Sequence, residues 1–235
     1  ENIFVQSKCG IVPGVMYDLS KKHILESVDG ILKRLDMEYL DALVLHRPDA
    51  LVEPEEVAAA FDELEKSGKV RHFGVSNQKP MQIELLKRYV KQPIEINQLQ
   101  LSIPCSNMIT NGMEVNMASE GAVDRDGSVL DYCRLNDITI QAWSPFQYGF
   151  FEGVFIGNEE KYPELNAILN ELADKYNVSP SGIATAWILR HPAGIQMIAG
   201  STSRKHMQEI IDGSHVTLTR EEWYRLYLAG DHILP

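Results

Sequence analysis

The stretch LVLHRPD, residues 43–49, is an apolar run that ends in a histidine, an arginine and a proline. Its aliphatic residues predict a buried strand over residues 41–46. Pro48 lacks an N–H group and cannot continue the hydrogen-bond ladder of a sheet. We therefore expect the chain to turn out of the sheet at Arg47 and Pro48, so that His46 lies at the carboxyl end of its strand.

Short β-branched runs alternate with amphipathic helical stretches on both sides of this strand, a pattern typical of parallel sheets built from strand-helix units. Six strands are predicted, at residues 3–8, 41–46, 70–76, 95–101, 138–143 and 195–199. Helix starts are indicated by the cap residue Ser20, by Pro54, Pro80 and Ser179-Pro180, and by a capping box of Thr219 and Glu222. A further helix is predicted over residues 127–135, and the sequence also indicates helices around Leu169 and Ile210.

Six parallel strand-helix units predict an α/β fold of the (β/α)₈ TIM-barrel class, seen here without its first two units. A six-stranded arc would leave two unprotected edges, which natural proteins avoid. We therefore expect two further units before residue 1 and treat residues 1–235 as one barrel-type domain. An open doubly wound sheet is the alternative, but the turn after the first strand, residues 9–14, is not a GxGxxG fingerprint.

The composition excludes several classes of partner. The chain has 235 residues, 44% of them hydrophobic and 23% charged, which is enough for one large core. A net charge of −11 without a basic stripe argues against nucleic acid or an anionic membrane as a partner. Cys9, Cys105 and Cys133 lack metal-ligand spacing, which favours reduced thiols in a cytoplasmic protein and indicates no structural metal. The sequence does not indicate an oligomeric state.

Polar side chains mark the ends of all six predicted strands. They are Lys8, His46, Ser76 with Asn77, Gln98 (which lies within its strand), Trp143 with Ser144, and Gly200 with Ser201. Each has an ordinary structural explanation, such as a solvated lysine, a hydrogen-bonded core histidine or a turn. A barrel, however, gathers these ends at one mouth. Together they offer a cation, an imidazole, amides, hydroxyls and an aromatic face, a set that suits a planar amide-bearing ring beside a polarised carbonyl.

The run GSTSRKH, residues 200–206, directly precedes a predicted helix. Backbone amides at a helix N-terminus, hydroxyl donors and an arginine all favour an oxyanion, and the loops after the last barrel strands commonly bind phosphate. We predict a phosphate site here. A plain helix cap is the alternative.

Several of these motifs together resemble the aldo-keto reductase family. They are SKCG (7–10), LVLHRPD (43–49), GKVRHFGVSN (68–77), INQLQ (96–100), QAWSPF (141–146) and IAGST (198–202). The longer run QAWSPFQYGFFEG is similar to the bacterial oxidoreductases of the YdhF type. The resemblance implies a (β/α)₈ barrel that binds NADP(H) and reduces an aldehyde or ketone to an alcohol by hydride transfer, with a small carbonyl compound as substrate.

The resemblance also implies roles for individual residues. Lys8 matches the family lysine, whose ammonium lowers the pKa of a catalytic tyrosine. His46 matches the histidine that orients the carbonyl oxygen. The implied cofactor-binding residues are Ser76, Asn77 and Gln98 for the carboxamide, Trp143 for ring stacking, Ser144, Pro145, Phe146 and Gln147 for the pyrophosphate, and Gly200, Ser201, Thr202, Ser203, Arg204 and His206 for the adenosine phosphate.

The sequence departs from the family pattern in two places. No residue matches the family's aspartate and tyrosine, which precede the lysine strand, so we expect both upstream of residue 1. Where the family often has a glutamate-asparagine pair after the last strand, this chain has Glu209-Ile210, which leaves NAD open beside NADP.

Two other functions and two loops stay open at this point. The chain could be a nicotinamide-binding regulatory subunit that senses redox state with little turnover, or a phosphate-binding barrel in which Lys8 forms a Schiff base. Residues 102–125 either shape the substrate mouth or are a surface insertion. The aromatic loop either covers the cofactor or packs on the barrel rim. Its aromatic residues are Phe146, Tyr148, Phe150, Phe151 and Phe155.

Overall fold

The computed structural model describes residues 3–149 and 152–233, and the chain divides into two compact units. Unit 1 comprises Glu1–Gln98 and Asp131–Thr139, and unit 2 comprises Leu99–Leu130 and Ile140–Pro235. A six-stranded sheet has the strand order β1-β4-β5-β6-β7-β10. This α/β arrangement confirms the predicted strand-helix repeat.

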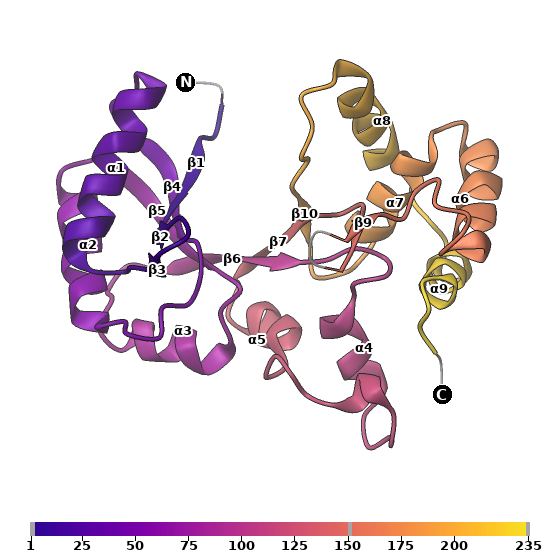
Figure 1. Cartoon of the computed structure of the whole chain (residues 1–235), viewed down its shortest axis with the longest axis horizontal. Helices are drawn as coiled ribbons and strands as arrows, with labels where there is room; N and C mark the ends of the chain where they lie inside the picture. The colour runs from indigo at the N-terminus through magenta and orange to yellow at the C-terminus, as the bar shows by residue number, and fades with distance from the viewer. Residues whose placement is uncertain (1–2, 150–151, 234–235) are drawn as a thin grey trace. The chain divides into compact units, whose positions relative to one another are not determined.

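Unit 1 is built from parallel neighbours that alternate with helices (Figure 1). Its strands are β1 (Gln6–Cys9), β4 (Leu40–Leu45), β5 (Val70–Ser76) and β6 (Ile94–Gln100), the last of which runs on into unit 2. Its helices are α1 (Lys21–Leu35), α2 (Pro54–Lys66) and α3 (Pro80–Lys87), together with most of α5 (Val129–Leu135). Since β1 pairs with β4, β4 with β5, and β5 with β6, all in parallel, their carboxyl ends lie at one edge of the unit.

Local sequence explains where α1 begins and which face it buries. The Ser20 hydroxyl accepts a hydrogen bond from the backbone N–H of His23, as predicted for the cap. Ile24 and Val28 are fully buried, since their helical spacing places them on the face toward the sheet. The helical spacing of Ile24, Val28, Ile31, Leu32 and Leu35 predicts one apolar face, but Leu35 is 48% exposed because it lies in the last turn.

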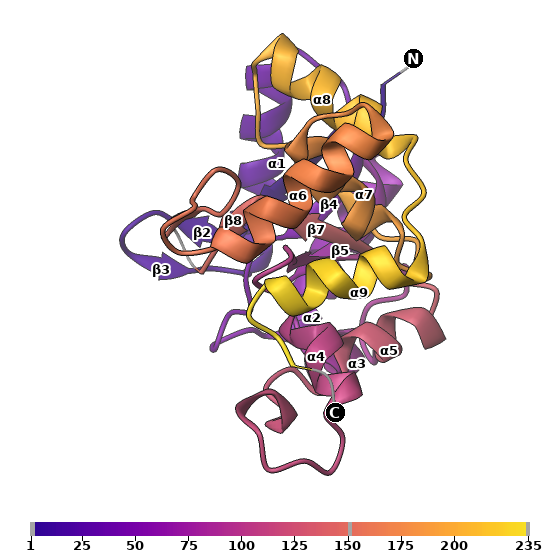
Figure 2. The ribbon, with the colours of Figure 1, turned by 90° about the vertical axis from the view of Figure 1, so that its right-hand side faces the viewer.

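Unit 2 contains the remaining parallel pair, β7 (Thr139–Trp143) and β10 (Gln196–Met197), with Met197 opposite Ala142. Its helices are α4 (Asn107–Met113), η1 (Glu120–Ala122), α6 (Pro163–Tyr176), α7 (Pro180–Leu189), α8 (Arg204–Ser214) and α9 (Arg220–Ala229). Figure 2 shows α6, α7 and α9 gathered side by side. The predicted capping box of α9 is present, with reciprocal hydrogen bonds between Thr219 and Glu222.

Two close contacts fix the helices of unit 2. A Cβ atom on Gly213 would lie 2.2 Å from the carbonyl oxygen of Gly182, so α8 and α7 meet backbone to backbone. The indoles of Trp187 and Trp223 stack 4.8 Å apart, and each donates its Nε1–H to the backbone carbonyl of the other. These contacts lock α7 to α8 and α7 to α9.

Two small hairpins and helix α4 were not predicted. The hairpins pair β2 (Ile11–Val12) with β3 (Met16–Tyr17) and β8 (Gln147–Tyr148) with β9 (Gly153–Val154). Strands of two residues are too short for a hydrophobic period to reveal. Among the described residues, no helix combines the length and apolar character that crossing a membrane requires.

Candidate active site

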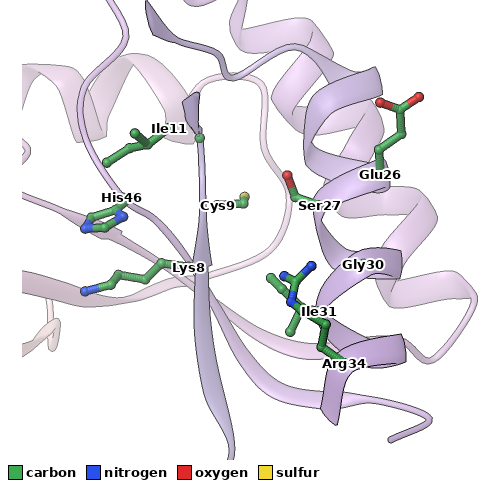
Figure 3. Close-up of a pocket in the computed structure, with 10 residues that line it drawn as sticks. Lys8, Cys9, Ile11, Glu26, Ser27, Gly30, Ile31, Arg34 and His46 are labelled. Carbon is green, nitrogen blue, oxygen red and sulfur yellow. The ribbon is translucent and has the colours of Figure 1, made fainter. Parts of the chain in front are cut away.

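The pocket of unit 1 that holds the lysine and the histidine lies beside β1. Lys8 and His46 point to the same side of this strand, whereas Cys9 points toward α1 (Figure 3). This alternation follows from the two-residue period of a strand. The pocket has a volume of about 240 Å³ and is lined from two sides. Lys8, Cys9, Gly10, Ile11 and His46 line one side, and Glu26, Ser27, Gly30, Ile31 and Arg34 of α1 line the other. Burial raises the pKa of the Cys9 thiol to about 12, so this residue is not a nucleophile at neutral pH.

The ammonium of Lys8 is held by an amide. Its Nζ donates a hydrogen bond to Oε1 of Gln98 across 2.6 Å. Burial lowers the pKa of Lys8, and the nearby Arg47 guanidinium lowers it further. The pocket thus contains a cation that is partly desolvated and fixed in direction.

His46 is the first residue after β4, and its backbone N–H donates to the carbonyl oxygen of Cys9 at 2.8 Å. Burial, then the charges of Lys8 and Arg47, lower the pKa of its imidazole to about 4. The ring is therefore neutral at pH 7, so one nitrogen carries a proton and can donate it in a hydrogen bond.

The three predicted carboxamide-binding residues meet at the ends of β5 and β6. The Ser76 hydroxyl donates to the Gln98 carbonyl at 2.9 Å and accepts a hydrogen bond from Nδ2 of Asn77 at 2.9 Å. Asn77 has a φ of 54°, a left-handed conformation that asparagine tolerates. The structure thus brings Lys8, Gln98, Ser76 and Asn77 into one connected network, with His46 lining the pocket around Lys8.

In unit 2, Ser144, Pro145, Phe146 and Gln147 form a tight turn directly after β7. The Gln147 N–H donates to the Ser144 carbonyl at 3.1 Å, and Pro145 occupies the second position, where its fixed φ suits a turn. The Ser102 hydroxyl donates to the carbonyl of Gln147 at 2.6 Å and anchors the far end of the turn. Trp143 precedes the turn, and its carbonyl accepts from the N–H of Leu101.

Residues 200–203 lead into the N-terminus of α8 and form its cap. Ser203 accepts a hydrogen bond from the His206 N–H and donates its own N–H to the Ser201 hydroxyl. Arg204 and His206 are exposed in the first turn of α8. Thr202 is also exposed, and nothing lies within 4 Å of a Cβ built on Gly200. The segment thus presents the exposed side chains of Arg204, Lys205 and His206 at a helix N-terminus.

The two predicted cofactor segments of unit 2 follow neighbouring strands. The N–H of Ile198 donates to the Ala142 carbonyl at 2.9 Å, which extends the parallel pairing of β10 with β7. The turn after Trp143 and the loop from Gly200 therefore leave adjacent strands at their carboxyl ends. The sequence pattern predicted that the strands before these two segments are parallel, and the pairing of β7 with β10 agrees with that prediction.

The aromatic loop and the segment 102–125 are partly embedded in unit 2. Phe155 is fully buried, and Tyr148 packs against Tyr162 at 5.4 Å, while Phe150 and Phe151 lie outside the described residues. The segment contains α4, which Thr110 ties to the Tyr227 hydroxyl at 2.8 Å. The segment therefore contains a short helix that its polar sequence does not favour and that tertiary contacts stabilise, while its role at the substrate mouth stays a prediction.

Sequence reasoning missed the side of the pocket that α1 lines, including Glu26, Ser27 and Arg34, and it missed two further features near Lys8 and His46. Arg47 lowers the pKa of both Lys8 and His46, and Ile11 supplies an apolar side chain to the pocket. The position of Arg47 next to His46 is a signal that could have been used. Within residues 3–149 and 152–233, no group of three or more His, Cys, Asp or Glu side chains could hold a metal ion.

The arrangement of a lysine, a neutral histidine and a buried amide group at parallel strand ends agrees with the sequence comparisons. The profile of the Aldo/keto reductase family matches residues 1–228. The chain belongs to this family. Membership in the family supports carbonyl reduction in general as the activity of this protein. Aldo-keto reductases generally use NAD(P)H.

Curated relatives cover nearly the whole chain. It is 35% identical to the uncharacterized oxidoreductase YcsN of Bacillus subtilis, over 97% of this chain and 73% of that protein. It is 30% identical to a 6-dehydroglucose reductase of Agrobacterium fabrum, over 97% and 72%, and 30% identical to the oxidoreductase YdhF of Escherichia coli, over 98% and 73%. The predicted relationship to the YdhF-type branch is thus confirmed.

A solved structure confirms the fold class. The chain superposes on the thermostable aldo-keto reductase Tm1743, determined in complex with the inhibitor epalrestat, with a TM-score of 0.73 and 26% identity. The match covers 97% of this chain and 71% of that one. The six strand-helix units therefore correspond to part of an aldo-keto reductase TIM barrel.

Proposed function

We propose that this protein is an NADP(H)-dependent oxidoreductase that reduces an aldehyde or ketone to an alcohol. The observation that carries the proposal is the neutral imidazole of His46, placed in one pocket with the fixed ammonium of Lys8. A neutral donor and a cation together suit a carbonyl oxygen, because that oxygen gains negative charge as the carbonyl carbon is attacked.

His46 orients the substrate in this proposal. Its protonated ring nitrogen donates a hydrogen bond to the carbonyl oxygen and exposes the carbon to the cofactor. A pKa of about 4 keeps the imidazole neutral throughout the physiological range. The hydrogen bond therefore does not depend on the cell's pH.

Lys8 supplies positive charge beside the reacting oxygen. In the family, this lysine lowers the pKa of the tyrosine that gives the carbonyl oxygen its proton. We assign the proton donor to that tyrosine, which no residue of the printed chain matches, and assign to Lys8 the electrostatic support of the proton transfer.

Each unit, taken by itself, contains residues that suit one part of a nicotinamide dinucleotide. Ser76, Asn77 and Gln98 form a network of amide and hydroxyl groups of the kind that recognises a carboxamide, with Ser76 and Gln98 buried and Asn77 half-buried. Arg204 and His206 lie at the N-terminus of α8, which suits the 2′-phosphate of NADP(H) in a chain of net charge −11. When bound, the reduced nicotinamide supplies the hydride for the carbonyl carbon and leaves as NADP⁺.

The substrate class is open to a direct search. Two curated relatives carry the name 6-dehydroglucose reductase, so a sugar aldehyde belongs in the substrate panel beside aliphatic aldehydes, aromatic aldehydes and diketones. The natural gene product, purified with its own termini, is mixed with NADPH and each carbonyl compound. We expect loss of absorbance at 340 nm together with formation of the alcohol.

Matched variants separate chemistry from stability. We expect Lys8→Met and His46→Ala to abolish turnover, whereas Lys22→Met and His72→Ala, at sites outside the pocket, keep it. Arg204→Ala should weaken NADPH binding roughly tenfold without changing NADH binding, as expected for a lost charge-assisted hydrogen bond. Tight NADPH binding without turnover on any compound would contradict the proposal and favour a regulatory subunit.

A further inference from the structure

The pocket of unit 1 depends on two segments that are far apart in the sequence. Lys8 comes from β1, and His46 comes from the loop after β4. The N–H of His46 donates to the Cys9 carbonyl at 2.8 Å, which ties the histidine to the lysine strand at one point. The sheet pairing of Leu45 with Cys9 fixes the start of the loop, but it does not by itself fix the path of the residues that follow His46.

A second connection comes from Asp49, three residues after His46. Its Oδ2 accepts a hydrogen bond from the backbone N–H of Leu19 at 3.0 Å, and its Oδ1 accepts one from the N–H of Leu51 at 2.9 Å. The carboxylate therefore joins the histidine loop to the segment between β3 and α1. Pro48 restricts the backbone between Arg47 and Asp49.

Leu19 in turn packs against the end of the lysine strand. It is 1% exposed, and a Cβ atom on Gly10 would lie 2.5 Å from its Cδ2 atom. Gly10 has a φ of 102° and directly follows Cys9, whose carbonyl holds His46. The contacts thus close a ring that runs from His46 through Cys9, Gly10, Leu19 and Asp49 back to the histidine loop.

We propose that Asp49 is a positioning residue that holds His46 at its working distance from Lys8. The kinetic consequence rests on the function proposed above. Asp49 is not one of the residues that line the pocket, so we expect it to act on His46 through the backbone of the loop that both residues share. A misplacement of about 1 Å in a catalytic group costs on the order of 100-fold in rate, so a small loop shift is measurable.

The chain offers a matched control for the test. Asp41 also joins the β1 segment to β4, because its Oδ2 accepts from the N–H of Val5 at 2.8 Å, but it lies at the opposite end of β4. Asp41→Ala and Asp49→Ala both remove a carboxylate that accepts a backbone hydrogen bond. Only Asp49→Ala disturbs the ring of contacts around His46.

The kinetic arm compares these variants in the natural gene product. We expect Asp49→Ala to lower kcat roughly 10- to 100-fold with little change in the KM for NADPH, and Asp41→Ala to keep kcat within about threefold of wild type. Asp49→Asn retains one acceptor oxygen and should lie between Asp49→Ala and wild type, even if Asp49→Ala folds poorly. A loss of kcat in Asp49→Ala no larger than in Asp41→Ala would overturn the proposal.

A second arm needs no turnover. The His46 imidazole faces Lys8 from β1 and Arg47 from its own loop, and their charges help to hold its pKa near 4. If the loop moves outward in the Asp49 variants, the pKa of the His46 imidazole, measured by NMR titration, should rise toward 6.5. In Asp41→Ala, the pKa of the His46 imidazole should stay unchanged. An unchanged pKa in Asp49→Ala and Asp49→Asn would overturn the positioning role. If the wild type shows no turnover at all, the proposed function fails and this titration alone decides about Asp49.

Discussion

The hydrogen bond between Lys8 and Gln98 spans 2.6 Å although β4 and β5 lie between their strands in the sheet. Neighbouring strands are about 4.8 Å apart, so β1 and β6 would be roughly 14 Å apart if the sheet were flat. The two side chains meet because the sheet of unit 1 curves and brings them together on its concave side. Barrel curvature is thus built into this unit.

Replacing Gln98 should change the acid-base behaviour of Lys8. In Gln98→Leu the ammonium loses a hydrogen-bond acceptor, and we expect the pKa of Lys8, which burial already lowers, to fall further. Gln98→Glu places a carboxylate beside the Lys8 ammonium and should raise the pKa of Lys8. The measurement is the pH dependence of reductive methylation of Lys8, followed by mass spectrometry. The same pKa in wild type and both variants would show that the amide does not support the ammonium.

The depressed pKa of His46 predicts how stability changes with pH. The imidazole has a pKa of about 4 when folded and about 6.5 when unfolded, so between these values the unfolded chain binds more protons. Stability should therefore fall as the pH falls from 6.5 toward 4. His46→Gln removes this dependence, which urea denaturation at pH 7 and pH 5 can measure. Equal losses of stability in wild type and variant between these two pH values would contradict the assignment.

Glu222 should stabilise unit 2 only while it is ionised. Burial raises the pKa of this carboxyl, but hydrogen bonds from Lys175, Thr219 and Tyr176 outweigh burial and lower it to about 2. We expect Glu222→Gln to cost about 2 kcal/mol at pH 7, as for other buried hydrogen bonds to charged groups. The stabilisation is present above pH 4.5 and is lost as the pH falls toward 2.

A surface carboxylate provides the control for Glu222. Glu171 pairs with Arg225 in solvent, where water and salt screen the pair, so Glu171→Gln should cost much less than Glu222→Gln. Both values come from urea denaturation at pH 7. Equal costs for the two substitutions would show that the Glu222 network contributes no more than an exposed ion pair.

The contact between α7 and α8 predicts opposite effects for two glycines. In Gly213→Ala the new methyl group would meet the backbone of Gly182, and we expect a loss of about 1–3 kcal/mol as the helices separate. Gly112, near the end of α4, has nothing within 4 Å of its Cβ position, so Gly112→Ala should be neutral or stabilise by up to about 1 kcal/mol. Thermal unfolding of both variants measures the difference. A Gly213→Ala protein as stable as wild type would contradict the backbone contact.

Local sequence patterns predicted the regular elements well. The strand over residues 70–76 and the cap of α1 at Ser20 agree with the structure because both depend on a few consecutive residues. Helix α4 could not be found this way. Its sequence NMITNGM has weak helix propensity, and the contact of Thr110 with Tyr227, 117 residues later, helps to hold it.

The candidate site was predicted in its residues but not in its contacts. Strand-end positions identified Lys8, His46 and Gln98 as one group. In unit 1, Lys8 binds Gln98 and lines a pocket with His46, while their roles in catalysis and cofactor binding stay a prediction. The bond from Lys8 to Gln98 and the bond from Asp49 to Leu19 join residues 90 and 30 positions apart. Only the path of the folded chain determines such pairs, so no local pattern could reveal them.

The stacked pair of Trp187 and Trp223 gives unit 2 an optical signature. Two indoles 4.8 Å apart with an interplanar angle of 6° are close enough for their electronic transitions to couple, so folding of α7 against α9 should produce an exciton signal in circular dichroism. The third tryptophan of the chain is Trp143, at the predicted nicotinamide position. Its fluorescence can therefore report cofactor binding while the coupled pair independently reports the integrity of the fold.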